Sequence, residues 1–198
     1  DMLWSGARTS VNPFTVQEIS DALKGVDVMV LVKNPVNPEI DLWVGAIERI
    51  AKAGIRHLGA IHRGFSTYEK TSYRNQPNWQ LPIELRHRIH DLPLICYPSH
   101  IAGSRQFLRE ISQKALDLNY DGLMIESHID PDKALSDAAQ QVTPDDLRNL
   151  LSSLVIRNPV ASDHKLLDIL GELRQQIDLF DEHLLDLLEK RMKVAETI

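Results

Sequence analysis

Cysteine is almost absent from this chain, which has one in 198 residues. A single cysteine excludes an intrachain disulfide framework and is typical of cytoplasmic proteins. No apolar run approaches the length of about 20 residues that spans a bilayer, and no signal-peptide pattern opens the chain. Lys and Arg number 22 against 28 Asp and Glu, and the net charge of -6 argues against general binding to nucleic acid or to a membrane surface.

The glycine-rich Gly-x-Gly-x-x-Gly turn of dinucleotide-binding folds is also missing. The chain instead alternates strand-like runs with helical patterns about every 30 residues, which is typical of parallel β/α units. The expected strands are short and largely apolar: Met2–Ala7, Val28–Lys33, His57–His62, Leu94–Tyr97 and Gly122–Glu126. The clearest helical patterns between them are Thr15–Leu23, Asp41–Ala53 and Arg105–Leu118.

Polar side chains stand where these runs end, and they decide between two α/β architectures. Five strands could form a doubly wound open sheet, or they could be five units of a (β/α)8 barrel, which needs eight. The residues in question are Arg8, Lys33, Arg63, His100 and Glu126. In a barrel the carboxyl ends of the strands face one common mouth, whereas in an open sheet they spread along an edge. The sequence therefore favours five units of a TIM barrel.

Three of the polar residues could hold a divalent metal. His100, Glu126 and Asp137 offer one imidazole and two carboxylates, a set that suits Mn, Fe, Co or Zn with a position left for substrate. The alternative is that Asp137 caps a helix starting near Ala138, that Glu126 pairs with an arginine, and that His100 is an ordinary loop residue. Cys96 is too far along an extended strand from His100 to share an ion and is expected to be a buried thiol.

Three cations at other strand ends indicate an anion site. Arg8 follows Gly6-Ala7, Lys33 precedes Asn34-Pro35, and Arg63 precedes Gly64. A small residue beside a cation lets an anion reach both the side chain and the backbone N–H. The alternative for each cation is a pairing with a carboxylate at the barrel rim.

Five motifs in order make the first part of the chain resemble a known family. They are Trp4-Ser5-Gly6-Ala7-Arg8-Thr9, Leu31-Val32-Lys33-Asn34-Pro35, Gly59-Ala60-Ile61-His62-Arg63-Gly64-Phe65, Pro98-Ser99-His100, and the block from Glu126 to Asp137. The sequence is similar to 3-deoxy-D-arabino-heptulosonate 7-phosphate synthase of the type I beta branch over roughly residues 1–155. That family is a TIM barrel that joins phosphoenolpyruvate to erythrose 4-phosphate at the head of the shikimate pathway, which supplies aromatic amino acids.

The resemblance assigns roles to the residues above. It implies that His100, Glu126 and Asp137 bind the metal. It implies that Lys33 and Arg63 bind phosphoenolpyruvate, together with Arg8 and the backbone of Gly6 and Ala7. Lys33, Arg63 and His100 would be the catalytic residues, and the metal would activate the aldehyde of erythrose 4-phosphate.

The chain departs from the family pattern in several places. The family's metal-binding cysteine and its Lys-Pro-Arg-Thr motif lie on the first two barrel strands, which would precede residue 1. We therefore expect a chain shortened at both ends that is inactive on its own. The family usually has Asp where Tyr97 stands and an aliphatic residue at Ser5.

The last part of the chain has a different pattern. Apolar residues fall at 166, 170, 173, 177, 180, 184, 187, 194 and 198, which predicts one long amphipathic helix with a coiled-coil-like seam. The segments Leu173–Asp178 and Leu187–Arg191 resemble the first helix of an all-helical chorismate mutase. That resemblance implies that Arg174 and Arg191 bind chorismate and that the helix forms a homodimer.

The expected organisation is a partial barrel at 1–157, a linker at 158–163 and a mutase-like helix at 164–198. The expected activity is the synthase reaction fused to conversion of chorismate to prephenate. Two alternatives stay open: an octulosonate-phosphate synthase-like barrel, or a non-catalytic sensing or interaction fragment.

Overall fold

The chain forms two compact units, Asp1–Ile156 and Arg157–Ile198. The computed structural model describes residues 1–68, 71–157 and 164–196. The linker predicted at 158–163 lies outside the described residues, as do positions 197 and 198 of the predicted terminal helix. The predicted division into a barrel, a linker and a helix therefore stays a prediction.

The first unit is built on a parallel sheet of five strands in sequential order, β1-β2-β3-β4-β5. Its strands are β1 (Met2–Ser5), β2 (Met29–Lys33), β3 (Leu58–His62), β4 (Leu94–Cys96) and β5 (Gly122–Leu123). A strand occurs at each predicted place, and each neighbouring pair is parallel. Several strands end earlier than predicted, because Gly6, Tyr97 and Met124 already belong to the loops that carry the polar residues.

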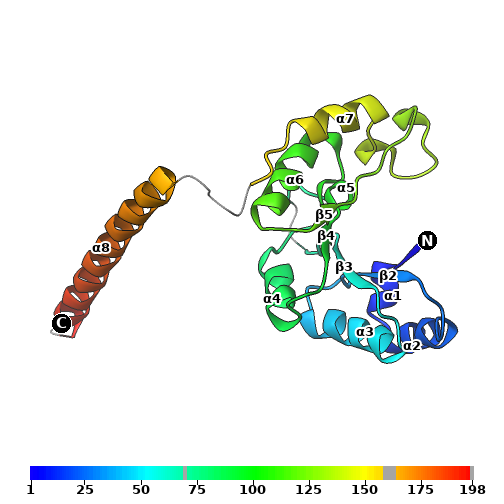
Figure 1. Cartoon of the computed structure of the whole chain (residues 1–198), viewed down its shortest axis with the longest axis horizontal. Helices are drawn as coiled ribbons and strands as arrows, with labels where there is room; N and C mark the ends of the chain where they lie inside the picture. The colour runs from blue at the N-terminus through cyan, green and yellow to red at the C-terminus, as the bar shows by residue number, and fades with distance from the viewer. Residues whose placement is uncertain (69–70, 158–163, 197–198) are drawn as a thin grey trace. The chain divides into compact units, whose positions relative to one another are not determined.

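Helices connect the strands and lie along one side of the sheet (Figure 1). The α-helices of this unit are α1 (Ala7–Ser10), α2 (Pro13–Ala22), α3 (Ile40–Lys52), α4 (Gln80–Arg88), α5 (Pro98–Ala102), α6 (Leu108–Asp117) and α7 (Pro144–Ser152). Short 3-10 turns are η1 (Arg105–Phe107), η2 (Pro131–Lys133) and η3 (Ala138–Gln140). The sequence predicted an α-helix from Arg105. This prediction was wrong in the first turn, where the 3-10 turn η1 precedes α6.

Helix α3 shows how the outer layer attaches to the sheet. Its buried residues Trp43, Ala46, Ile47 and Ile50 follow the spacing of one helix face, so they form a stripe that packs against the strands. The indole N–H of Trp43 donates a hydrogen bond of 3.0 Å to the carbonyl of Val32 in β2. The stripe and this bond fix α3 to the sheet.

The two faces of the sheet carry different residues. Val30 and Val32 belong to the large core under the helices, whereas Leu31, Ile61 and Tyr97 form a smaller cluster on the opposite face. Because side chains alternate along a strand, positions 33 and 63 continue the rows of Leu31 and Ile61. Lys33 and Arg63 are therefore placed at the carboxyl ends of the strands on the face of the smaller cluster.

Asn34 fixes the ends of β2 and β3 to each other. Its side chain is fully buried, and its Oδ1 accepts a hydrogen bond of 2.7 Å from the backbone N–H of Arg63. Its Nδ2 donates to the carbonyls of Pro35 and Gly64, at 2.8 Å each. These bonds hold the loops after the two strands in register and thereby position Arg63 relative to Lys33.

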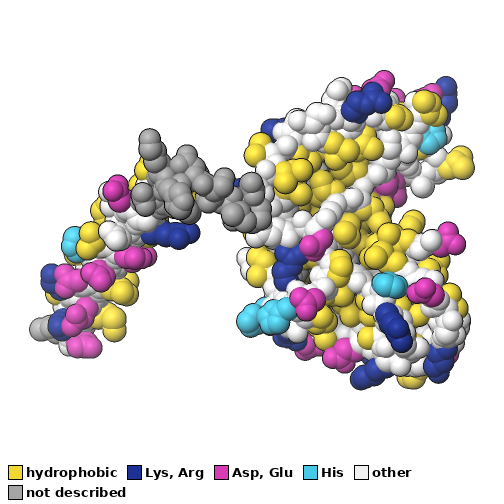
Figure 2. Space-filling model, viewed as in Figure 1, with side chains coloured by type: hydrophobic (Ala, Val, Ile, Leu, Met, Phe, Trp, Pro, Cys, Tyr) yellow, Lys and Arg dark blue, Asp and Glu magenta, His cyan; other side chains and the backbone are white. Residues whose placement is uncertain are grey.

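The second unit contains the long helix α8 (His164–Ala195) of 32 residues. Within the described part of the predicted seam, Leu173, Ile177 and Leu184 expose 48%, 56% and 57% of their surface. Figure 2 shows hydrophobic side chains beside acidic and basic ones along this helix. Among the helices the structure describes, none has the length and apolar character needed to cross a membrane.

Candidate functional site

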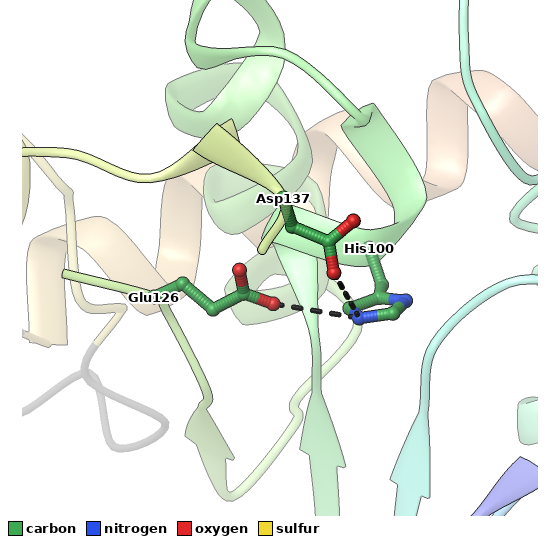
Figure 3. A group of neighbouring side chains, drawn as sticks. All are labelled: His100, Glu126 and Asp137. Atoms are coloured by element: carbon green, nitrogen blue, oxygen red, sulfur yellow. Dashed lines mark ion pairs between the residues drawn. The ribbon is translucent and has the colours of Figure 1, made fainter. Parts of the chain in front are cut away.

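His100, Glu126 and Asp137 meet at the carboxyl end of the sheet, each carried by a different segment (Figure 3). His100 lies on α5 after β4, Glu126 follows β5, and Asp137 precedes η3. The Nε2 atom of His100 is 3.4 Å from Glu126 Oε1 and 3.9 Å from Asp137 Oδ2. One potential ligand atom from each residue lies within 4.8 Å of the other two.

This donor set fits a divalent transition metal. Ligands bound at about 2.0–2.2 Å to one ion lie roughly 3–3.5 Å apart. The 3.4 Å from His100 to Glu126 lies in this range, and the 3.9 Å from His100 to Asp137 is somewhat longer. Burial, with nearby Arg63, Arg74 and Lys33, lowers the pKa of His100 from 6.5 to about 4. The imidazole is therefore uncharged near neutral pH, which is the form that binds a metal.

Asp137 does not cap the turn that follows it. It occupies the N-cap position of η3 but makes no side-chain capping hydrogen bond, and its φ of 51° places it in the left-handed region. Its Oδ1 instead accepts a hydrogen bond of 2.7 Å from Arg74, and this bond lowers the carboxyl pKa against the opposing effect of burial. Its Oδ2 lies 3.9 Å from His100 Nε2, so the described contacts of Asp137 do not fit the helix-capping alternative.

Glu126 is held by neutral side chains rather than paired with an arginine as in the alternative interpretation. Its Oε1 accepts hydrogen bonds from the hydroxyl of Tyr97 and from Nε2 of Gln140, the latter at 2.8 Å. Its backbone N–H donates to Ser99 Oγ at 3.0 Å. Among the described hydrogen bonds and ion pairs of this carboxylate, none is with an arginine.

The predicted anion-binding residues line one cavity of about 510 Å³. Gly6, Ala7, Arg8, Lys33 and Arg63 all border it. The cavity also includes His100 of the proposed metal set and a fourth cation, Arg74, together with Val36, Ser66 and Asn75. Residues that follow four different strands therefore line one cavity beside the proposed metal set.

Electrostatics in this cavity favour an anionic ligand. Burial lowers the pKa of Arg63 from 12.5 to about 10, and the nearby charges of Arg74 and Arg8 contribute to this lowering. Burial and then Arg63 also lower the pKa of Lys33, against a smaller opposing effect of Glu126. Both shifts mean that the cations repel one another and are incompletely solvated, so a bound anion would relieve both costs.

Arg74 and Gln140 were not predicted from the sequence. Arg74 Nη1 bonds Asp137 Oδ1 at 2.7 Å and Gln140 Oε1 at 2.9 Å, so these two residues connect the carboxylates of Asp137 and Glu126. Arg74 lies in a long loop after β3, away from any strand end, and Gln140 is an uncharged residue that is 1% exposed. Neither residue directly follows a predicted strand, whereas the other candidate site residues were identified by that position.

Two buried titratable residues lie outside the site. Cys96 is a free, fully buried thiol on β4, as predicted, and burial raises its pKa. The described metal group does not include it. His62 is also fully buried, with Nε2 2.6 Å from the carbonyl of Pro77 and Nδ1 2.8 Å from the hydroxyl of Tyr120.

Arg174 and Arg191, predicted to bind chorismate, both lie on α8 and are exposed. They are 17 residues apart, which corresponds to about 25 Å along a helix. Within one chain they cannot contact the same small ligand.

Comparison with known proteins identifies the family of the first unit. The model of the DAHP synthetase I family matches residues 1–157. A phospho-2-dehydro-3-deoxyheptonate aldolase of Thermotoga maritima is 28% identical over 171 residues, which are 86% of this chain and 46% of the relative. A 2-dehydro-3-deoxyphosphooctonate aldolase of Desulfotalea psychrophila is 41% identical, but over only 54 residues, or 27% of this chain.

The fold has the same relatives. A truncated form of 3-deoxy-D-arabino-heptulosonate 7-phosphate synthase from Thermotoga maritima superposes with a TM-score of 0.66 and 27% identity, covering 86% of this chain and 60% of that one. A further structure of the Thermotoga enzyme superposes with a TM-score of 0.68 and 27% sequence identity, and this chain covers 46% of it. This chain spans about half the length of the curated relative that it matches over most of its own length. Its five parallel β/α units correspond to part of the TIM barrel of these enzymes, as predicted.

Proposed function

This chain belongs to the DAHP synthetase I family, and we propose that its first unit takes part in a metal-dependent condensation of phosphoenolpyruvate with erythrose 4-phosphate. The product would be 3-deoxy-D-arabino-heptulosonate 7-phosphate. The observation that carries the proposal is the single cavity in which Arg8, Lys33 and Arg63 lie beside His100. It combines a site for a phosphorylated anion with a site for a metal.

The residues of the cavity have separate tasks in this reaction. Arg8, Lys33 and Arg63 would hold the phosphate and carboxylate of phosphoenolpyruvate, and the open backbone at Gly6 and Ala7 lets the anion approach closely. These cations stabilise the charge that shifts as C3 of phosphoenolpyruvate forms a bond to the aldehyde carbon. Water then adds at C2 and phosphate leaves.

The metal residues act at the other reactant. His100, Glu126 and Asp137 would hold one divalent ion of the Mn, Fe, Co or Zn class. Such an ion supplies Lewis-acid polarisation of the aldehyde oxygen. The short distances from His100 Nε2 to both carboxylates support a shared ion.

The anion assignment can be tested by titrating the 198-residue chain with phosphoenolpyruvate in a calorimeter. Lys33→Ala and Arg63→Ala should each weaken binding by about 1.5–3 kcal/mol, since each removes a charge-assisted hydrogen bond. The matched control is Lys52→Ala, which removes an exposed lysine that pairs with Glu48 on α3. Equal affinities in all four proteins would remove Lys33 and Arg63 from the site.

The aldehyde substrate is tested separately by phosphate release. When the chain is joined to the first two barrel strands of the family, we expect release from phosphoenolpyruvate and Mn²⁺ with erythrose 4-phosphate rather than arabinose 5-phosphate, because similarity to the heptonate enzyme extends over 171 residues and similarity to the octonate enzyme over 54. The reverse preference would favour the octulosonate-type alternative. Tight ligand binding with no release from either aldehyde would favour a non-catalytic sensing role.

For the second unit we propose the start of an all-helical chorismate mutase domain that joins two chains through α8. Two features support this proposal: α8 extends over 32 residues, and it presents apolar side chains along an exposed seam. Arg174 and Arg191 would bind the carboxylates of chorismate in two sites shared between antiparallel helices. The aromatic amino acid pathway and a cytoplasmic location are part of the same proposal.

A further inference from the structure

Tyr97 contacts both halves of the proposed site. It follows β4, is 7% exposed and lies on the same face of the sheet as Leu31 and Ile61. Its side chain reaches Glu126 of the metal set and Lys33 of the anion set. The sequence identifies Tyr97 only as a departure from the expected Asp, so its contacts come from the structure alone.

The hydroxyl of Tyr97 orients one metal ligand. It donates a short hydrogen bond to Glu126 Oε1, the atom that also accepts from Gln140 and lies 3.4 Å from His100 Nε2. Two donors on one oxygen fix the plane of the carboxylate.

The ring of Tyr97 packs against Lys33 and His100. Lys33 Nζ lies 4.7 Å from the centroid of this ring, a distance at which a cation is attracted to an aromatic face. The same ring lies 4.4 Å, centroid to centroid, from the imidazole of His100. One aromatic side chain therefore contacts a residue of the anion set, Lys33, and a residue of the metal set, His100.

We propose that Tyr97 is a positioning residue that orients Glu126 through its hydroxyl and Lys33 through its ring. The inference rests on the proposed function, because it assumes that these residues bind a metal and a phosphorylated anion. The contributions to the metal site and to the anion site come from different atoms of Tyr97. The hydroxyl serves the metal site, and the ring serves the anion site.

Two substitutions separate the two roles in the 198-residue chain. Tyr97→Phe removes the hydroxyl and keeps the ring, so Mn²⁺ affinity should fall about 10- to 100-fold, as for other residues that orient a ligand. Phosphoenolpyruvate affinity should change less than twofold. Tyr97→Leu removes both contacts, so phosphoenolpyruvate affinity should also fall, by about fivefold.

The matched control is Tyr73→Phe, which removes another hydroxyl that donates to a glutamate, at 2.8 Å from Glu110 Oε1. Tyr73 lies outside the cavity, so both affinities should stay at the wild-type values. Mn²⁺ and phosphoenolpyruvate are titrated separately by calorimetry, and circular dichroism checks that each variant is folded.

The possible outcomes distinguish the inference from the proposed function. The split described above supports the inference. Wild-type affinities in Tyr97→Phe, or parallel loss of both ligands in both variants, would overturn it while leaving the proposed function in place. A wild-type chain that binds neither Mn²⁺ nor phosphoenolpyruvate would overturn the proposed function and the inference together.

Discussion

At the scale of single residues, the proposed metal site depends on the orientation of three ligands from distant positions in the chain. His100 is partly buried, and this burial, with the surrounding cations, lowers its pKa so that the imidazole is neutral near pH 7. Glu126 and Asp137 are each held by hydrogen bonds from residues that bind no metal themselves. Such partners reduce the reorganisation needed when an ion binds.

Removal of one ligand should therefore weaken metal binding strongly. We expect His100→Ala and Glu126→Ala each to reduce Mn²⁺ affinity by more than about 100-fold. The affinity is measured by calorimetry or by the electron paramagnetic resonance signal of free Mn²⁺. The matched control is His57→Ala, which removes an exposed histidine 3.8 Å from Asp27. Stoichiometric, tight Mn²⁺ binding in either ligand variant would show that the ligands are assigned incorrectly.

A second residue-scale prediction concerns His62 and pH. Burial is the main cause that lowers its pKa from 6.5 to about 3, so between these values the unfolded chain binds a proton that the folded chain does not. Its contribution to stability is thus complete above about pH 6.5 and is lost as the pH falls toward 3, by about 1.4 kcal/mol per pH unit. The fall in unfolding free energy with acid should be shallower in His62→Gln.

Urea titrations of the wild type and His62→Gln at several pH values measure this difference. Other groups titrate in the same range, but they titrate in both proteins and cancel when the two curves are subtracted. Parallel curves between pH 6.5 and 4 would contradict the assignment of a buried neutral imidazole.

At the scale of elements, the short helix α5 is held in place by the loop after β3. The backbone N–H groups of Arg74 and Asn75 donate to the carbonyls of Ala102 and Ile101, at 3.2 Å each. Nδ2 of Asn75 also donates to the carbonyl of His100 at 2.6 Å. The loop therefore fixes the helix that carries His100 and places Arg74 beside Asp137.

Gly103 makes this contact possible. It ends α5 with φ of 67°, and an added Cβ would lie 2.4 Å from the Cβ of Arg74. Gly103→Ala should lower the unfolding free energy by the left-handed penalty of about 1–2 kcal/mol plus about 1–3 kcal/mol for the clash. It should also displace Arg74 and thereby weaken Mn²⁺ binding.

The matched control is Gly25→Ala, because Gly25 has a similar φ of 77° and no atom within 4 Å of the added Cβ. This variant isolates the backbone penalty, and its Mn²⁺ affinity should not change. Equal unfolding free energies for the two variants would mean that the loop yields without strain and does not fix α5.

At the scale of the whole molecule, the two units differ in how they bury apolar surface. The first unit has a core on both sides of its sheet, whereas α8 leaves Ile177, Phe180 and Leu184 more than half exposed. A row of apolar residues at helical spacing is stabilised when it packs against another helix. This is the physical reason for the proposed homodimer.

Sedimentation of the chain over a range of concentrations should show a dimer. Ile177→Lys should weaken the association at least about tenfold, since it places a charge in the apolar seam. Gln175→Lys adds the same charge on the other side of the helix and should have little effect. A monomer at all concentrations, or equal effects of both substitutions, would contradict dimerisation through this seam.

Much of the fold and part of the candidate site follow from local patterns. Apolar runs alternating with helical patterns predicted the five strands, and strand-end positions identified Lys33, Arg63, His100 and Glu126. The period of two along a strand and the common direction of parallel strands bring such residues together. The roles assigned to them remain proposals.

The rest was decided by tertiary structure. Arg74 lies in the loop after β3 and Gln140 in η3, 66 positions apart, and only folding brings their side chains together at 2.9 Å. Tyr97 gave no sign in the sequence that it would contact both Lys33 and Glu126. By itself the sequence determined where the five strands lie and which polar residues follow them, because that depends on local periodicity. The orientation of Glu126 and Asp137 toward one point was decided by hydrogen bonds between distant loops, which no local pattern encodes.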